Sequence, residues 1–203
     1  MSSVQRFRGR IAGWGTASGT RLVVGRWDVS PFGAFADVMV ERPDGERILL
    51  APSHQVADLV ATTYRFDRVE VCPVTVHRVA GPEDWHVVAG PLEAWVDVGR
   101  RTALGRVLRM VPRRVATSHR TTLLTDPVAR VALRGVRTRG SAGPGRVEHY
   151  GATDVHEITG ARTEWAGERL GDLRDVDPPV RFGFGSTPRR PVVTDVVTTI
   201  TAR

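Results

Sequence analysis

The sequence predicts an α+β fold in which strands dominate, built as an antiparallel sheet or barrel with a few helices packed against it. Most of the chain consists of short runs rich in valine, threonine and aromatic residues, separated by glycine and proline, which is typical of strands. Helical periodicity is confined to residues 54–64 and to a basic segment near 103–134. Because helices do not alternate with single strands, a parallel doubly wound sheet is not expected.

The expected strands fall on both sides of the basic segment. They are Gln5–Ala12, Thr20–Trp27, Phe35–Glu41, Glu46–Leu50, Arg68–Val79, Trp85–Val98 with a break at Gly90-Pro91, Arg146–Thr153, Val155–Trp165, Val180–Ser186 and Val192–Thr201. Turn signals stand at Gly13-Trp14-Gly15 and at Arg42-Pro43-Asp44-Gly45, where Gly45 supplies the positive φ of a hairpin turn. We expect one domain, in which residues 1–99 and 147–203 form one sheet system and residues 100–146 are a basic helical insertion.

The helix at 54–64 is predicted from its cap and its stripe. Ser53 is a good N-cap, and Val56, Leu59 and Val60 fall on one face at helical spacing.

Basic charge is concentrated in Arg100–Arg146. This segment holds twelve arginines against one acid, Asp126, and so carries +11, whereas the rest of the chain carries −4. Within it, one helix is expected to begin after Thr102 and to end at Pro112, and a second is expected to begin at Asp126. Arginines of this segment are candidate anion ligands, namely Arg106, Arg109, Arg113 and Arg114. They suit nucleic acid, an anionic membrane or a phosphorylated small molecule, and the alternative is that they cover the solvent side of packed helices.

All 29 basic residues are arginine, because the sequence contains no lysine. This excludes Schiff-base chemistry, a lysine general base and a lysine-bearing phosphate loop.

The segment Arg181–Arg190 has the composition of an anion-binding loop. It combines glycines with the hydroxyls of Ser186 and Thr187 and the guanidinium groups of Arg189 and Arg190. Since prolines and a strand follow, the helix dipole that strengthens phosphate loops is missing. The alternative is an ordinary loop between strands.

Asp154 and His156 are candidate catalytic residues. Two positions apart on a strand, they share a side and can pair as carboxylate and imidazole for acid and base chemistry. The alternative is that they are satisfied polar groups lining a barrel. No motif has metal-ligand or cofactor-binding spacing, so we expect no metal site and no cofactor.

The sequence contains five tryptophans and six phenylalanines, which either line a ligand cavity or fill a core. Gly25-Arg26-Trp27 is similar to the short tryptophan motif of lipocalin-like barrels, but the likeness covers three residues and the helical middle departs from that plan. The sequence therefore assigns no family.

We expect a cytoplasmic location, since the sequence offers neither a long apolar run nor a signal peptide. The single cysteine, Cys72, is expected to be a core residue.

Three functions remain open. The first is binding of a small, largely apolar ligand whose anionic group meets arginines. The second is an enzyme on the same scaffold that uses His156 with Asp154. The third is binding of nucleic acid or an anionic membrane through Arg100–Arg146.

Overall fold

The structure is a computed structural model that describes residues 4–79, 83–110, 139–141, 146–183 and 187–202, with the backbone alone at 139–141, 146–150 and 202. Its described part is dominated by strands and contains two helices, α1 (His54–Thr63) and α2 (Ala103–Met110). The predicted α+β class with strands dominant is confirmed.

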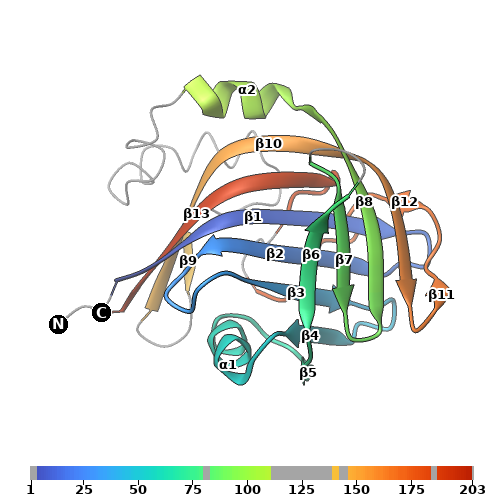
Figure 1. Ribbon diagram of the computed structural model, residues 1–203, viewed down its shortest axis with the longest axis horizontal. Helices are drawn as coiled ribbons and strands as arrows, with labels where there is room; N and C mark the ends of the chain where they lie inside the picture. Colours follow the sequence, from blue (N-terminus) through green and yellow to red (C-terminus); the bar gives the residue numbers. More distant parts are fainter. Residues whose placement is uncertain (1–3, 80–82, 111–138, 142–145, 184–186, 203) are drawn as a thin grey trace.

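Thirteen described strands form one curled sheet (Figure 1). The strands are β1 (Val4–Thr16), β2 (Arg21–Val29), β3 (Phe35–Glu41), β4 (Arg47–Ala51), β5 (Arg68–Val71), β6 (Val74–Arg78), β7 (Trp85–Ala89), β8 (Leu92–Arg101), β9 (Arg139–Ser141), β10 (Arg146–Trp165), β11 (Glu168–Arg169), β12 (Leu173–Arg174) and β13 (Val192–Ala202). The main path runs β5-β4-β3-β2-β1-β13-β10-β8-β7-β6. Its pairs are antiparallel except β4 with β5, which are parallel and joined through α1.

The sheet curls strongly around an inner core. Its concave face brings β1–β4 opposite β7 and β8, and β6 contacts β3. Trp14 and Trp85 are fully buried there, and the Trp14 indole Nε1 donates to Thr163 Oγ1 at 3.0 Å. Cys72 packs against the edge of this core, as expected from the sequence.

The outer face of β2, β3 and β4 is buried as well. Helix α1 covers it with Val56, Ala57 and Val60, joined by Phe182 from the C-terminal part of the chain. Ser53 caps the helix, since its Oγ accepts a hydrogen bond from the Val56 N–H at 3.3 Å. This helix confirms the prediction at 54–64.

A buried ion pair fastens the C-terminal segment to the sheet. The Glu41 side chain is fully buried, and its Oε1 lies 3.2 Å from Arg21 Nη2 and 2.7 Å from Arg181 Nε. The backbone N–H of Arg181 donates to Glu41 Oε2 at 2.6 Å, and Arg21 Nη1 donates to the Pro178 carbonyl at 2.9 Å. The carboxylate is therefore satisfied from two segments far apart in the chain.

Several sequence expectations about strands are wrong in detail. The described residues 180–183 of the expected strand Val180–Ser186 form no strand, and the two expected strands on either side of Asp154 are the single strand β10. Gly13-Trp14-Gly15 lies inside β1, where Thr187 and the Asp175 carbonyl pass so close that a Cβ at either glycine would collide with them. These glycines therefore permit close approach, and the turn lies after Thr16. The run Arg68–Val79 is two strands, β5 and β6, because the chain breaks at Cys72 and Pro73.

Part of the predicted basic helical segment is described. In α2, Thr102 is the N-cap, since its Oγ1 accepts a hydrogen bond from the Gly105 N–H at 3.0 Å. The helix packs on β10. The second predicted helix, which begins at Asp126, lies outside the described residues.

We expect Glu41→Ala to lower the free energy of unfolding by about 3–5 kcal/mol, because it leaves the Arg21 guanidinium buried without its carboxylate. Urea unfolding measures the loss. Glu46→Ala is the matched control, since Glu46 pairs with Arg42 and Arg68 at the surface and its removal should cost about 1 kcal/mol or less. Equal losses in the two variants would contradict the structural role given to Glu41.

Candidate functional site

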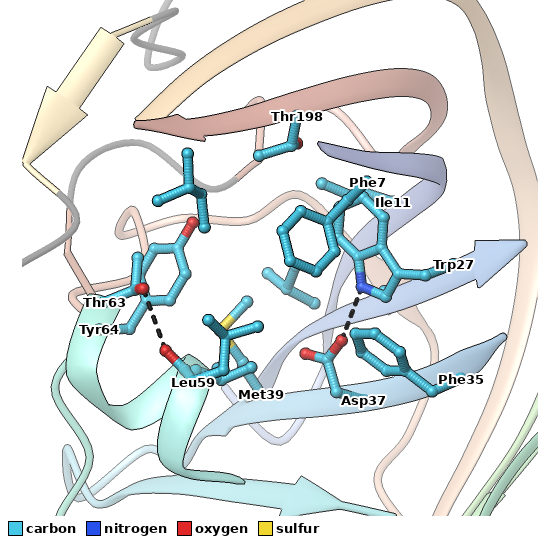
Figure 2. Close-up of a pocket in the computed structure, with 14 residues that line it drawn as sticks. Phe7, Ile11, Trp27, Phe35, Asp37, Met39, Leu59, Thr63, Tyr64 and Thr198 are labelled. Carbon is cyan, nitrogen blue, oxygen red and sulfur yellow. Dashed lines mark hydrogen bonds between the residues drawn. The ribbon is translucent and has the colours of Figure 1, made fainter. Parts of the chain in front are cut away.

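A pocket lies between the outer face of the sheet and α1 (Figure 2). Its unfilled space is about 560 Å³, counting the part that is open to solvent. The residues that line it are Phe7, Ile11, Val23, Gly25, Trp27, Phe35, Asp37, Met39, Leu59, Val60, Thr63, Tyr64, Thr198 and Ile200. The lining is mostly apolar, and it comes from β1, β2, β3, β13 and α1.

Strand alternation places these side chains together. Every second residue of β3 points away from the inner core, so Phe35, Asp37 and Met39 share the outer face. Trp27 of β2 lies beside them, and its ring packs edge-on against Phe7 with centroids 5.8 Å apart and planes at 70°. The aromatic rings form one wall of the pocket, and α1 forms the opposite wall (Figure 2).

Asp37 is the acidic side chain of the pocket and is 3% exposed. Its Oδ1 accepts a hydrogen bond from Trp27 Nε1 at 2.9 Å. Gly25 makes room for this pair, because a Cβ there would lie 2.6 Å from Asp37 Oδ1 and 2.7 Å from Trp27 Nε1. A side chain at position 25 would therefore fill the space in front of the carboxyl group.

Burial raises the pKa of Asp37 from 3.8 to about 7, although the hydrogen bond from Trp27 works in the opposite direction. The carboxyl group therefore changes its charge near neutral pH while enclosed by apolar side chains. A buried acid of this kind is characteristic of functional sites.

Thr198 of β13 contributes a second polar group to the lining. It is 2% exposed, and its hydroxyl has no hydrogen-bond partner among the described residues. A buried hydroxyl without a partner costs about 1–3 kcal/mol, so its retention suggests a use beyond stability.

The structure brings Asp154 and His156 together on the inner face of the sheet. His156 Nε2 lies 3.7 Å from Asp154 Oδ2, which is an ion-pair distance rather than a hydrogen bond. The other ring nitrogen, Nδ1, is 3.3 Å from the Gly99 carbonyl, which can only accept, so Nδ1 carries the hydrogen. Arg101 Nε donates to both oxygens of Asp154, at 2.8 and 2.9 Å.

The carboxylates of this inner cluster have opposite pKa shifts. Burial raises the pKa of Asp154, but the hydrogen bonds from Arg101 and the Val155 N–H and the charge of Arg101 together outweigh burial, so the net shift is downward. Asp195 of β13 lies opposite Asp154 of β10 in the antiparallel ladder. Burial raises the pKa of Asp195, although the nearby Arg10 guanidinium acts in the opposite direction. Because Arg101 holds both of its oxygens, Asp154 is a weak proton acceptor. The atom best placed to exchange a proton is His156 Nε2.

The residues of the predicted anion loop do not gather around one point. Thr187 is buried beside Gly13. Arg189 forms ion pairs within the chain, with its Nε 3.2 Å from Asp175 Oδ2 and its Nη2 2.8 Å from Asp177 Oδ2. Arg190 is exposed, and Ser186 lies outside the described residues.

The candidate arginines of the basic segment are described in part. Arg106 and Arg109 lie on α2 and are exposed, and Arg109 Nη1 comes within 4.0 Å of Asp154. Arg113 and Arg114 lie outside the described residues. Among the described residues that line the pocket, none is an arginine.

Sequence reasoning missed the pocket, although one signal pointed to it. The strand Phe35–Glu41 consists mostly of apolar residues typical of a buried strand. Apart from Glu41 at its end, its single acid is Asp37. A charged residue in such a run is rarely fully buried without a partner. Its partner, Trp27, lies ten residues earlier in the chain, and no local pattern pairs the two side chains.

No described helix is long and apolar enough to cross a membrane. Among the described residues, no group of three or more histidine, cysteine, aspartate or glutamate side chains is arranged to hold a metal ion.

No protein-family model and no curated protein sequence matches the chain. Among solved structures, the chain is similar to a Nitrosomonas europaea protein provisionally assigned as AttH, with 10% identity and a TM-score of 0.28. The match covers 98% of this chain and 51% of that one, so this chain spans about half the length of its structural neighbour. A likeness at this level carries no argument about fold or function.

The raised pKa of Asp37 predicts a pH-dependent effect of Asp37→Asn. The unfolded carboxyl group ionises near pH 3.8, whereas the folded one stays protonated up to about pH 7, so Asp37 lowers stability increasingly between these values. The variant should match the wild type near pH 3 and be more stable at pH 8 by a few kcal/mol, at about 1.4 kcal/mol for each pKa unit. Urea unfolding at several pH values measures the difference, and a constant difference would contradict the shift.

We expect Thr198→Val to raise the free energy of unfolding by about 1 kcal/mol, because it removes a buried hydroxyl that lacks a partner. Thr163→Val is the matched control. The Thr163 hydroxyl accepts the hydrogen bond from Trp14, so its loss should lower stability by about 1–2 kcal/mol. Thermal or urea unfolding distinguishes the two, and a loss of stability in both variants would show that the Thr198 hydroxyl is satisfied.

Proposed function

We propose that the protein binds a small, largely apolar molecule in the pocket between the outer sheet face and α1. The observation that carries the proposal is the Asp37 carboxyl group, which is buried among aromatic and aliphatic side chains and held in place by Trp27. A mostly apolar lining with a few fixed polar groups is the usual composition of a small-molecule site.

Stability alone does not account for these polar groups. The raised pKa of Asp37 and the unpartnered Thr198 hydroxyl both cost folding free energy. Proteins commonly keep such unfavourable groups at functional sites. A ligand that supplies the missing hydrogen-bond or charge partners regains this free energy when it binds.

The pocket supports binding of a small apolar ligand, the first function expected from the sequence, but with a different polar group on the ligand. Its lining supplies a carboxyl group, a tyrosine and two threonine hydroxyls, and no arginine. The proposed ligand is therefore apolar with a hydrogen-bonding group, and the lining offers no cation for an anionic group.

The other two functions stay hypotheses with less support. Both oxygens of Asp154 accept from Arg101, which weakens it as a proton acceptor for His156. The proposed nucleic-acid or membrane surface is the segment Arg100–Arg146, and six of its twelve arginines lie outside the described residues. The pocket is preferred because it holds a buried carboxyl group, fixed by Trp27, among apolar side chains.

The proposal predicts saturable binding of hexan-1-ol at the pocket. In a backbone amide and indole NMR titration, the largest shifts should fall on Trp27, Gly25 and Thr63, since the alcohol displaces solvent around them. Leu59→Trp should abolish these shifts, because Leu59 lines the pocket and a larger side chain there fills it. Ala61→Trp places the same side chain on the exposed face of α1 and should leave binding intact.

Shifts that do not saturate, or that survive in Leu59→Trp as well as in Ala61→Trp, would contradict binding at this pocket. Native mass spectrometry of the freshly purified protein adds an independent test, because a retained small molecule appears as a discrete additional mass.

A further inference from the structure

This inference rests on the proposed function and names the ligand's polar group. We propose that the ligand carries a positively charged amino group that pairs with the Asp37 carboxylate, while its apolar body lies against the aromatic rings and α1.

The first step compares the buried acids of the described residues, which are Asp37, Glu41 and Asp154. Glu41 and Asp154 each pair with arginine side chains of the chain itself. Asp37 has no basic partner among the described residues, and its hydrogen bond comes from the neutral Trp27 indole. Within the described part of the chain, two buried acids therefore have cationic partners and the third has none, which leaves it available to a cationic ligand.

The second step is the electrostatics of the pocket. The titratable side chains among the lining residues are Asp37 from β3 and Tyr64 next to α1, and those from β1, β2 and β13 carry no charge. In apolar surroundings a charge-assisted hydrogen bond is stronger than one between neutral groups. An ammonium group therefore gains more from this pocket than a hydroxyl does, and a carboxylate is repelled once Asp37 ionises.

The third step is preorganisation. Trp27 Nε1 holds Oδ1 of Asp37, and the tryptophan ring is itself packed against Phe7 and Phe35. The carboxyl group is thereby fixed before a ligand arrives, which reduces the entropy lost on binding. Thr198 lies three strands away from Asp37 along the sheet, roughly 14 Å at ordinary strand spacing, and so serves a different part of the ligand.

The test compares three probes with the same six-carbon chain: hexylamine, hexan-1-ol and hexanoate. In calorimetric titrations at pH 8, the amine should bind about tenfold more tightly than the alcohol, and hexanoate should bind most weakly. At pH 6 the amine should bind about tenfold more weakly than at pH 8, because Asp37 is then mostly protonated while an alkylamine keeps its charge at both pH values.

Two variants locate the effect. Asp37→Asn should remove the preference for the amine and leave binding of the alcohol within about twofold, because the amide keeps the acceptor for Trp27 but carries no charge. Thr198→Val, in the same pocket, should keep the preference.

The outcomes separate the two proposals. If amine and alcohol bind alike, if hexanoate binds most tightly, or if Asp37→Asn keeps the preference for the amine, the amino-group inference is overturned while ligand binding stands. If none of the probes binds, the proposed function fails and the inference fails with it.

Discussion

Strands β5 and β6 follow one another in the chain but lie at opposite ends of the strand order, with only Cys72 and Pro73 between them. Two residues bridge at most roughly 11 Å between the strand ends. A flat sheet of this many strands would hold its edges several times farther apart. The sheet must therefore curl until its edges meet, and this constraint creates both the enclosed inner core and the convex outer face (Figure 1).

The outer face is covered in a different way. Because β4 and β5 are parallel, the chain must cross over between them, and α1 is that crossover, laid over β2–β4. The C-terminal segment extends this cover and is held by the buried Glu41 carboxylate, which pairs with the buried Arg21 and the exposed Arg181. The pocket lies between α1 and the part of the outer sheet face that β1, β2, β3 and β13 form. It is thus a consequence of how a short helix covers a wide, convex sheet.

The two polar centres of the protein differ in how their charges are balanced. On the inner face, Asp154 is held by Arg101 and has a lowered pKa, which is how a structural ion pair behaves. On the outer face, Asp37 is buried with an indole as its neighbour and has a raised pKa. The first centre stabilises the folded chain by its own contacts. In the second, no described residue supplies a cation to Asp37, and this difference marks the pocket as the candidate site.

The sequence by itself determined the strand-rich class, the helix at 54–64 with its Ser53 cap, the start of α2 at Thr102 and the hairpin at Gly45, because capping, periodicity and turn chemistry are local. It also placed Asp154 and His156 on one side of a strand. Only the tertiary structure decided that Gly13 and Gly15 lie within a strand, that residues 68–79 divide between two sheet edges, and that Asp37 is buried against the Trp27 indole. These depend on which segments pass over which face, and no local pattern in the chain records that.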